Sequence, residues 1–145
     1  MVNIRKATYR DAPGIKALLQ GMGYPMRISQ LVSQLDILFN KEDHEVFVYE
    51  LHKEIVGFVF IHYLPQLTFE GNLLLISYLT VDESSKHATI ARELEQYVAA
   101  QAKNKKCETI QVHSMDWREP SYEFYVQQGY QEYPRYFIKK LIYVE

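Results

Sequence analysis

Hydrophobic and polar residues alternate at the start of the chain, in VNIRKA at residues 2–7, and this period of two predicts an opening strand. EVFVYEL (45–51) and IVGFVFIHYL (55–64) are rich in β-branched and aromatic residues. The short polar stretch HKE (52–54) between them predicts a hairpin. NLLLISYLTV (72–81) is almost uniformly apolar, as expected of a strand that is buried on both faces.

Apolar residues at helical spacing predict four helices. The positions that mark the first three are Ala12, Ile15, Leu18 and Leu19; Leu31, Leu35, Leu38 and Phe39; and Ile90, Leu94, Tyr97, Val98 and Ala102. The first should end at GMGYP (21–25), where two glycines and a proline break the pattern. A short fourth helix, EPSYEFYVQQ (119–128), should be stopped by Gly129.

The order of these elements favours a mixed α/β sheet. TIQVHS (109–114) is separated from the apolar strand 72–81 by one helix of suitable length for a parallel crossover. YFIKKLIYV (136–144) predicts a last strand. The sequence has no internal repeat, low-complexity segment or linker, so we expect a single domain over residues 1–145.

Composition narrows the possible functions. The chain has 145 residues, of which 48% are hydrophobic and 23% charged, as in an ordinary globular domain. A net charge of −2 with scattered cations leaves no basic stripe for a row of phosphates, so nucleic acid is not expected as a partner. The cluster KNKK (103–106) is explained by cations at a helix C-terminus.

Cysteine and histidine usage excludes further chemistry. Cys107 is the single cysteine, so no intramolecular disulfide is possible and a reducing, cytoplasmic setting is expected. The five histidines form no close ligand pair, and we expect no metal. The N-terminal segment lacks the apolar core of a signal peptide, and no run approaches the roughly 18 apolar residues of a membrane span.

One stretch carries a candidate chemical signal. VDESSKHATIARELEQYV (81–98) reads as a strand that runs into a phosphate-binding turn and then into an amphipathic helix. The turn between strand and helix nevertheless contains no glycine.

With this order of elements, the sequence resembles the GNAT superfamily, the Gcn5-related N-acetyltransferases. IRKATYRDAPGIKALL (4–19), followed by GYP, is similar to the first strand and helix of the bacterial branch. VYELHKEIVGFVFIHYLP (48–65) matches its hairpin, including the glycine at Gly57, and EFYVQQGY (123–130) matches a late motif. The resemblance implies a GNAT fold with a twisted mixed sheet of about six or seven strands, flanked by about four helices. Two central parallel strands would splay around the coenzyme.

The central family motif, laid on Val81 to Ala91, implies a site for acetyl-coenzyme A. Lys86 falls at its basic position, and His87 and Thr89 fall at its two glycines. Glycine lets a phosphate approach the backbone, so these two side chains would weaken binding rather than abolish it, and the Thr89 hydroxyl could add a hydrogen bond. The same KHA stretch also fits a solvated turn that caps an ordinary helix. The implied coenzyme-binding residues are Leu79, Thr80, Val81, Lys86, His87, Ala88, Thr89, Ile90, Ala91 and Ser114.

Acetyl transfer to an amine also requires a neutral nitrogen, a polarised thioester carbonyl and a proton for the departing thiolate. If the strand 72–81 has the family's bulge, the amides near Leu79 and Val81 would be free to meet the carbonyl and the pantetheine arm. Tyr125 falls at the family's thiolate-protonating tyrosine, although an aromatic core position also explains it. Candidates for the base are Glu70, Ser77, Tyr78 and His113, each of which also has a structural explanation; Glu70 is the candidate we place in the active site.

The resemblance therefore implies an N-acetyltransferase that moves acetyl from acetyl-coenzyme A to a primary amine of a small molecule or a peptide. The acceptor would enter between GMGYPM (21–26) and the loop around YPRYF (133–137). The alternative is a weak or inactive GNAT-fold module that binds an acyl-coenzyme A or another ligand in a regulatory role. A homodimer is compatible with either function.

Overall fold

The structure is a computed structural model that describes residues 3–68, 70–83, 87–113, 120–133 and 137–141. The chain divides into two compact units, residues 1–113 and 114–145, and each unit is treated by itself. The single domain expected over residues 1–145 stays a prediction.

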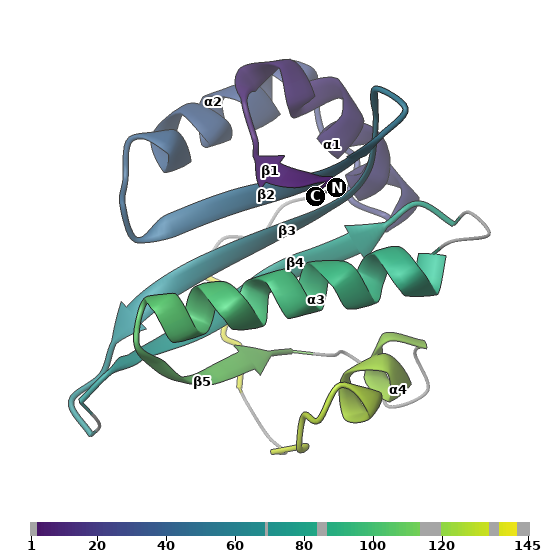
Figure 1. Cartoon of the computed structure of the whole chain (residues 1–145). Coiled ribbons are helices and arrows are strands. Elements are labelled where there is room, and N and C mark those ends of the chain that lie inside the picture. The colour runs from purple at the N-terminus through teal and green to yellow at the C-terminus, as the bar shows by residue number, and fades with distance from the viewer. Residues whose placement is uncertain (1–2, 69, 84–86, 114–119, 134–136, 142–145) are drawn as a thin grey trace. The chain divides into compact units, whose positions relative to one another are not determined.

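The first unit contains a five-stranded sheet in the order β1-β2-β3-β4-β5 (Figure 1). The strands are β1 (Ile4–Lys6), β2 (His44–Leu51), β3 (Glu54–Pro65), β4 (Asn72–Val81) and β5 (Cys107–Val112). Pairing is antiparallel from β1 to β4, while β4 and β5 are parallel and are joined by a crossover helix. These observations confirm the mixed sheet and the parallel crossover.

The four predicted helices are confirmed. They are α1 (Ala12–Gly21), preceded by the 3-10 turn η1 (Tyr9–Asp11), α2 (Ile28–Phe39), α3 (His87–Asn104) and, in the second unit, α4 (Pro120–Gln127). Gly129 ends α4 with a φ of 95°, a left-handed conformation that glycine adopts without strain, and the Tyr130 amide donates to the Tyr125 carbonyl.

The β2–β3 hairpin closes through a two-residue turn, as the short HKE stretch predicts. His52 and Lys53 have φ values of 51° and 65°, so both central residues are left-handed, as a type I′ turn requires. A bulge at Val56 follows, because the register passes from the pair Glu50–Ile55 to the pair Tyr49–Gly57.

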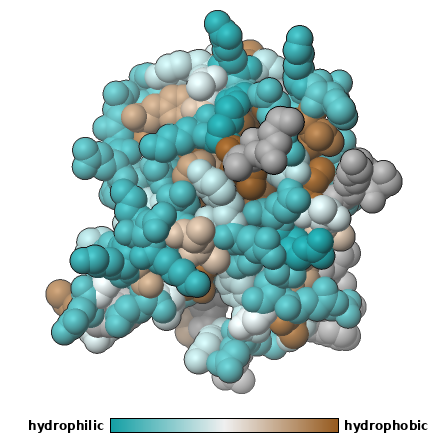
Figure 2. Space-filling view, viewed as in Figure 1, coloured by the Kyte–Doolittle hydropathy of each residue, from teal (hydrophilic) through white to brown (hydrophobic). Residues whose placement is uncertain are grey.

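Helices cover both faces of the sheet. Phe58 of β3 packs in a core cluster with Ile15 and Leu19 of α1 and Leu31 of α2. Gly57, its neighbour, points to the opposite face, because successive residues of a strand alternate, and that face is covered by α3. Hydrophilic residues predominate on the molecular face in Figure 2, on which α3 lies (Figure 1).

A charged cluster fixes the start of the chain to the sheet. Arg5 of β1 donates two hydrogen bonds to the Asp11 carboxylate, at 2.8 and 2.9 Å, and another to Glu50 of β2 at 2.6 Å. Asp11 also accepts the Thr8 amide at 2.7 Å, so it caps the first helical turn.

The expected number of strands was too high for the part of the chain that the structure describes. Of the strand expected at 136–144, residues 137–141 are described, and they are in no strand. Phe137 and Leu141 are 93% and 82% exposed. An apolar segment becomes a strand only where a neighbouring backbone supplies its hydrogen bonds, and a sequence pattern does not reveal that partner.

Candidate active site

The central strand β4 contains a bulge. Its pairing with β3 passes from Phe60–Tyr78 to Ile61–Ile76, so Ser77 is an extra residue without a partner across the ladder. The bulge that the family resemblance implies for this strand is therefore present.

Beyond the bulge, two β4 amides face away from β3. The Asp82 amide donates to the Val56 carbonyl at 2.7 Å, which marks a hydrogen-bonded pair. Such pairs alternate along an antiparallel ladder, so Thr80 and Tyr78 also bond to β3. Leu79 and Val81 lie between them and direct their backbone groups to the opposite edge.

We call this edge the open edge of β4, because no strand among the described residues pairs with it at this level. The parallel pairing of β4 with β5 ends at Ile76–Val112, so it does not reach Leu79 or Val81. The other end of the pair is closed, because the Asn72 amide donates to the Lys106 carbonyl at 3.2 Å and its side chain donates to Lys105. The ladder thus ends where β5 ends, and the residues that would continue β5 opposite Leu79 and Val81 lie outside the described residues, so the separation of the two strands stays a prediction.

The start of α3 follows this open edge in the sequence, with five residues between Val81 and His87. His87, Ala88 and Thr89 are exposed in its first turn, while Ile90 and Ala91 are buried. The first four amides of a helix lack intrahelical acceptors, and the helix dipole favours an anion there. The exposed turn is therefore suited to hold a phosphate group.

The His87 ring folds back toward the end of β4. Its Nδ1 lies 3.2 Å from the Asp82 carbonyl oxygen, and a carbonyl only accepts, so Nδ1 carries the proton. Asp82 and Glu83 add two exposed acidic side chains beside the turn. Lys86, the expected positive residue, and Ser114 lie outside the described residues.

An apolar cavity of about 630 Å³ lies on the other side of β4, under α1 and α2. The GMGYPM segment contributes Tyr24 and Met26, and the sheet contributes Phe58, Phe60 and Tyr78. The Tyr24 and Tyr78 rings meet edge to face, with centroids 5.8 Å apart. Among the described residues that line the cavity none is charged, and Gln30 and Gln34 bring side-chain amides.

A chain of hydrogen bonds runs beside this cavity. His62 of β3 contacts Ser77 Oγ through Nε2 at 2.5 Å and His44 of β2 through Nδ1 at 2.6 Å. His44 Nε2 in turn lies 3.3 Å from Asp43 Oδ1. Burial, with a smaller contribution from His44, lowers the pKa of His62, while Asp43 opposes the shift. Sequence reasoning missed His44 and His62 as a pair.

The other predicted base residues lie at different places. Glu70 precedes β4 at its closed end, and at about 3.3 Å per residue the seven steps from Asn72 to Leu79 alone span more than about 20 Å. The structure therefore does not bring Glu70 to the open edge. His113 follows β5 directly, one residue after Val112, the last β5 residue in the ladder with β4.

Tyr125 lies in the second unit and is buried. Its ring contacts Phe124 and Tyr130, with centroids 5.2 and 5.3 Å away. The aromatic environment expected of this helix is therefore present, and the catalytic role stays a prediction.

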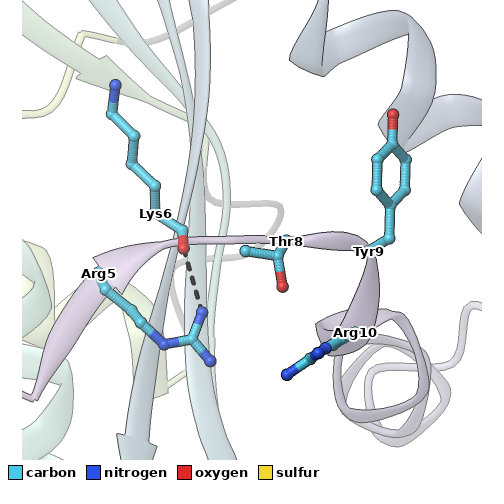
Figure 3. A pocket seen from close by; sticks show the side chains of 5 residues that line it. All are labelled: Arg5, Lys6, Thr8, Tyr9 and Arg10. Carbon is cyan, nitrogen blue, oxygen red and sulfur yellow. Dashed lines mark hydrogen bonds between the residues drawn. The ribbon is translucent and has the colours of Figure 1, made fainter.

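A second cavity is lined by Arg5, Lys6, Thr8, Tyr9 and Arg10 (Figure 3). Two of its cations are already neutralised. Arg5 is bound by Asp11 and Glu50, and Lys6 lies 3.4 Å from Glu45. The cavity is thus a weak candidate for an anion.

Two further observations limit the chemistry of the described residues. No cluster of three or more potential metal ligands occurs among them, and no helix in the part searched is long and apolar enough to cross a membrane. Burial raises the pKa of the Cys107 thiol, which disfavours the reactive thiolate.

The described fold is thus a mixed α/β sheet with a bulge in β4 and an exposed helix start after it. The sequence pattern of the Acetyltransferase (GNAT) family matches residues 14–130, and the chain belongs to this family. No curated protein matches the sequence.

Solved structures with the same fold include a transcriptional regulator from Bacillus halodurans C-125, with 22% identity, a TM-score of 0.86 and coverage of 97% of this chain and 100% of that one. A GNAT family acetyltransferase from Staphylococcus aureus has 16% identity, a TM-score of 0.81 and coverage of 95% and 97%. A ribosomal-protein-alanine N-acetyltransferase from Brucella melitensis has 18% identity, a TM-score of 0.76 and coverage of 97% and 100%. At these identities the likeness concerns the fold.

Proposed function

We propose that this protein is a cytoplasmic N-acetyltransferase that moves acetyl from acetyl-coenzyme A to a primary amine with an apolar substituent. The observation that carries the proposal is the open edge of β4 beyond the Ser77 bulge, where the Leu79 and Val81 amides point away from β3 and no described strand pairs with them. Family membership supports the same reaction.

In this proposal the backbone binds the coenzyme. The Leu79 and Val81 amides, with Thr80 between them, hold the thioester carbonyl and the pantetheine arm. The α3 start, from His87 to Ala91, meets the pyrophosphate through its exposed amides. Lys86 and Ser114 complete the proposed set.

The cavity under α1 and α2 supports an apolar acceptor. Its walls offer aromatic and aliphatic side chains, and its described lining provides no charge to pair with a carboxylate or phosphate. An arylalkylamine, or an amine beside an apolar side chain in a peptide, suits these walls. An acceptor with an ionised substituent there would lose hydration without gaining an ion pair.

Tyr125 is the proposed donor of the proton to the departing thiolate. A phenol with a pKa near 10 can protonate a thiolate whose conjugate acid has a pKa near 8.5 when it is well positioned. Glu70 has no part in the proposed chemistry, because it lies at the closed end of β4.

Thiol release from acetyl-coenzyme A tests the proposal. Phenethylamine is compared with an amine of similar size that carries a carboxylate, with free coenzyme measured by a thiol reagent. The apolar amine should react at least about tenfold faster, since an unpaired buried charge costs more than 1.4 kcal/mol. Equal rates with the two amines would contradict the preference for an apolar acceptor. If no amine released thiol from acetyl-coenzyme A, the proposed acetyltransferase activity would be wrong.

The glycine-free turn favours a second function, a regulatory module that binds an acyl-coenzyme A without turnover. His87 and Thr89 stand where the family has glycines, which would slow or weaken productive binding. Thermal stabilisation by acetyl-coenzyme A without thiol release would support this module, and absence of stabilisation would exclude both functions.

A further inference from the structure

The strongest feature outside the coenzyme-binding residues is a pair of hydrogen bonds that joins His44, His62 and Ser77, with the Asp43 carboxylate 3.3 Å from His44 Nε2. This chain spans three segments: Asp43 just before β2 with His44 at its start, His62 on β3, and Ser77 in the β4 bulge. Ordinary packing does not need two histidines in series, and this arrangement can carry a proton from one strand to the next.

The negative charge of Asp43 sets the direction of the chain. With Asp43 Oδ1 3.3 Å from His44 Nε2, the tautomer that carries its proton on Nε2 is favoured, and that ring accepts at Nδ1. His62 therefore donates from Nδ1 and leaves Nε2 as an acceptor. Ser77 Oγ consequently donates to His62 Nε2, and its lone pairs remain directed outward.

Each link thus points from Ser77 toward Asp43. When Ser77 Oγ accepts a proton, its own hydroxyl proton can move to His62 Nε2. At the far end the Asp43 side chain is 59% exposed, so the chain ends in solvent. The His62 side chain itself is half-buried and packs against the Phe60 ring, at a centroid distance of 4.4 Å.

The Ser77 end of the chain lies where the proposed reaction would occur. Ser77 is exposed, it is the bulge residue, and it directly follows Ile76, the last β4 residue paired with β5. The next residue, Tyr78, lines the acceptor cavity together with Phe60. Ser77 is thus adjacent to both the open strand edge and the cavity wall.

Resting on the proposed acetyltransferase function, we propose that Ser77 Oγ takes the proton from the acceptor nitrogen and relays it to His62. As the nitrogen attacks the thioester carbonyl, the new N–C bond makes its remaining protons acidic. One of them moves to Ser77 Oγ while the serine proton moves to His62 Nε2, giving an imidazolium. The C–S bond breaks, and the thiolate leaves with a separate proton.

The surroundings of His62 suit this role. The titratable groups that face it are His44 from β2 and Asp43 just before that strand, while β4 presents the uncharged Ser77. Burial lowers the pKa of His62, which favours the neutral ring that can accept a proton. The His62 proton on Nδ1 can then pass to His44, whose imidazolium Asp43 would stabilise.

Activity and pH profiles test the relay. With an amine that the wild-type protein acetylates, His62→Gln should lower kcat about 100-fold, the order expected for loss of a general base. Ser77→Ala should cause a similar loss, whereas Ser77→Thr, which keeps a hydroxyl, should stay within about threefold of the wild type. The wild-type rate should rise with pH as His62 loses its proton, and His62→Gln should abolish this rise.

Controls separate the relay from a structural tie between strands. His52→Asn replaces a histidine of the same hairpin in a turn where asparagine is favoured, and should leave kcat unchanged. Calorimetry with coenzyme A should give the same Kd for each relay variant. The relay is wrong if His62→Gln or Ser77→Ala keeps the wild-type kcat, or if the rise of the rate with pH persists in His62→Gln. Neither result would contradict the proposed acetyltransferase function.

A measurement on the unliganded protein tests the direction independently. Long-range nitrogen–proton NMR of the imidazoles should show His62 protonated on Nδ1 and His44 on Nε2 at neutral pH. The opposite tautomers would overturn the relay. A wild-type protein that acetylates no amine would instead overturn the proposed function, and the relay with it.

Discussion

Gly57 of β3 lies directly beneath Leu94 of α3. A Cβ at Gly57 would lie 3.1 Å from Leu94 Cδ1 and 3.3 Å from the Thr80 carbonyl oxygen. The backbone neighbour cannot move without disturbing β4, so the absence of a side chain allows the helix to approach the sheet.

Gly57→Val should therefore lower the free energy of unfolding by about 1–3 kcal/mol, the usual cost of overpacking. Urea unfolding monitored by circular dichroism measures this difference. Gly21→Ala is the matched control, because a Cβ at that helical glycine would meet nothing within 4 Å. It should be neutral or stabilising by up to about 1 kcal/mol. Equal destabilisation by both variants would contradict the close-approach argument.

Asp11 should make the stability of the protein dependent on acid pH. Burial alone would raise the pKa of this carboxyl, but the Arg5 guanidinium and the Thr8 amide together hold it below its usual value. The stabilisation is therefore complete above the unfolded pKa of about 3.9 and is lost as the pH falls through the lower folded pKa.

Asp11→Asn should accordingly cost about 1–3 kcal/mol at pH 7, because hydrogen bonds to a charged partner are lost. Unfolding in urea between pH 7 and pH 3 should show the difference from wild type constant above about pH 5 and smaller below about pH 4. Glu42→Gln, at an exposed position, serves as the control and should be neutral. A difference that grows in acid would refute the ionic role of Asp11.

The first turn of α3 offers a test of the missing glycines. His87→Gly and Thr89→Gly should each tighten coenzyme A binding several-fold if their side chains obstruct the phosphates. Calorimetry measures Kd. Ala88→Gly, in the same exposed turn, introduces the same backbone freedom but removes only a methyl group, so its Kd should change less. Unchanged affinity in the first two variants would show that the steric explanation is wrong.

Tyr125→Phe tests the proposed proton donor. Loss of general acid catalysis should lower kcat by about 100-fold and leave coenzyme affinity nearly unchanged. Tyr122→Phe is matched to it, since it removes a hydroxyl from the same helix, where it bonds to Glu132. That variant should turn over normally. A wild-type rate in Tyr125→Phe would exclude the hydroxyl from the mechanism.

Much of this fold could be predicted, because apolar spacing reports directly on which residues face a core. The helices and the first five strands follow from such spacing. The strand expected at 136–144 illustrates the limit, since its described residues 137–141 have suitable composition but no strand partner. The composition of a segment favours an extended backbone, but whether that segment pairs with a neighbouring strand depends on the rest of the molecule.

The histidine pair shows why the candidate site was harder to predict. In a regular hairpin closed by His52 and Lys53, the residue opposite His44 would be Ile61. The bulge at Val56 shifts the register by one residue and places His62 there instead. A one-residue shift exchanges the two faces of a strand, so the contact depends on an irregularity that leaves no mark in the hydrophobic pattern.

The hydrogen bonds from Asn72 to the turn after α3 fix one end of the β4–β5 pair. The ladder from Asn72–Cys107 to Ile76–Val112 then holds the two strands together, and β4 continues past it to Val81. A pantetheine arm that bound along this extension of β4 would meet the Leu79 and Val81 peptide groups, which no described strand pairs with on that side, so its binding would not require the β4–β5 ladder to break.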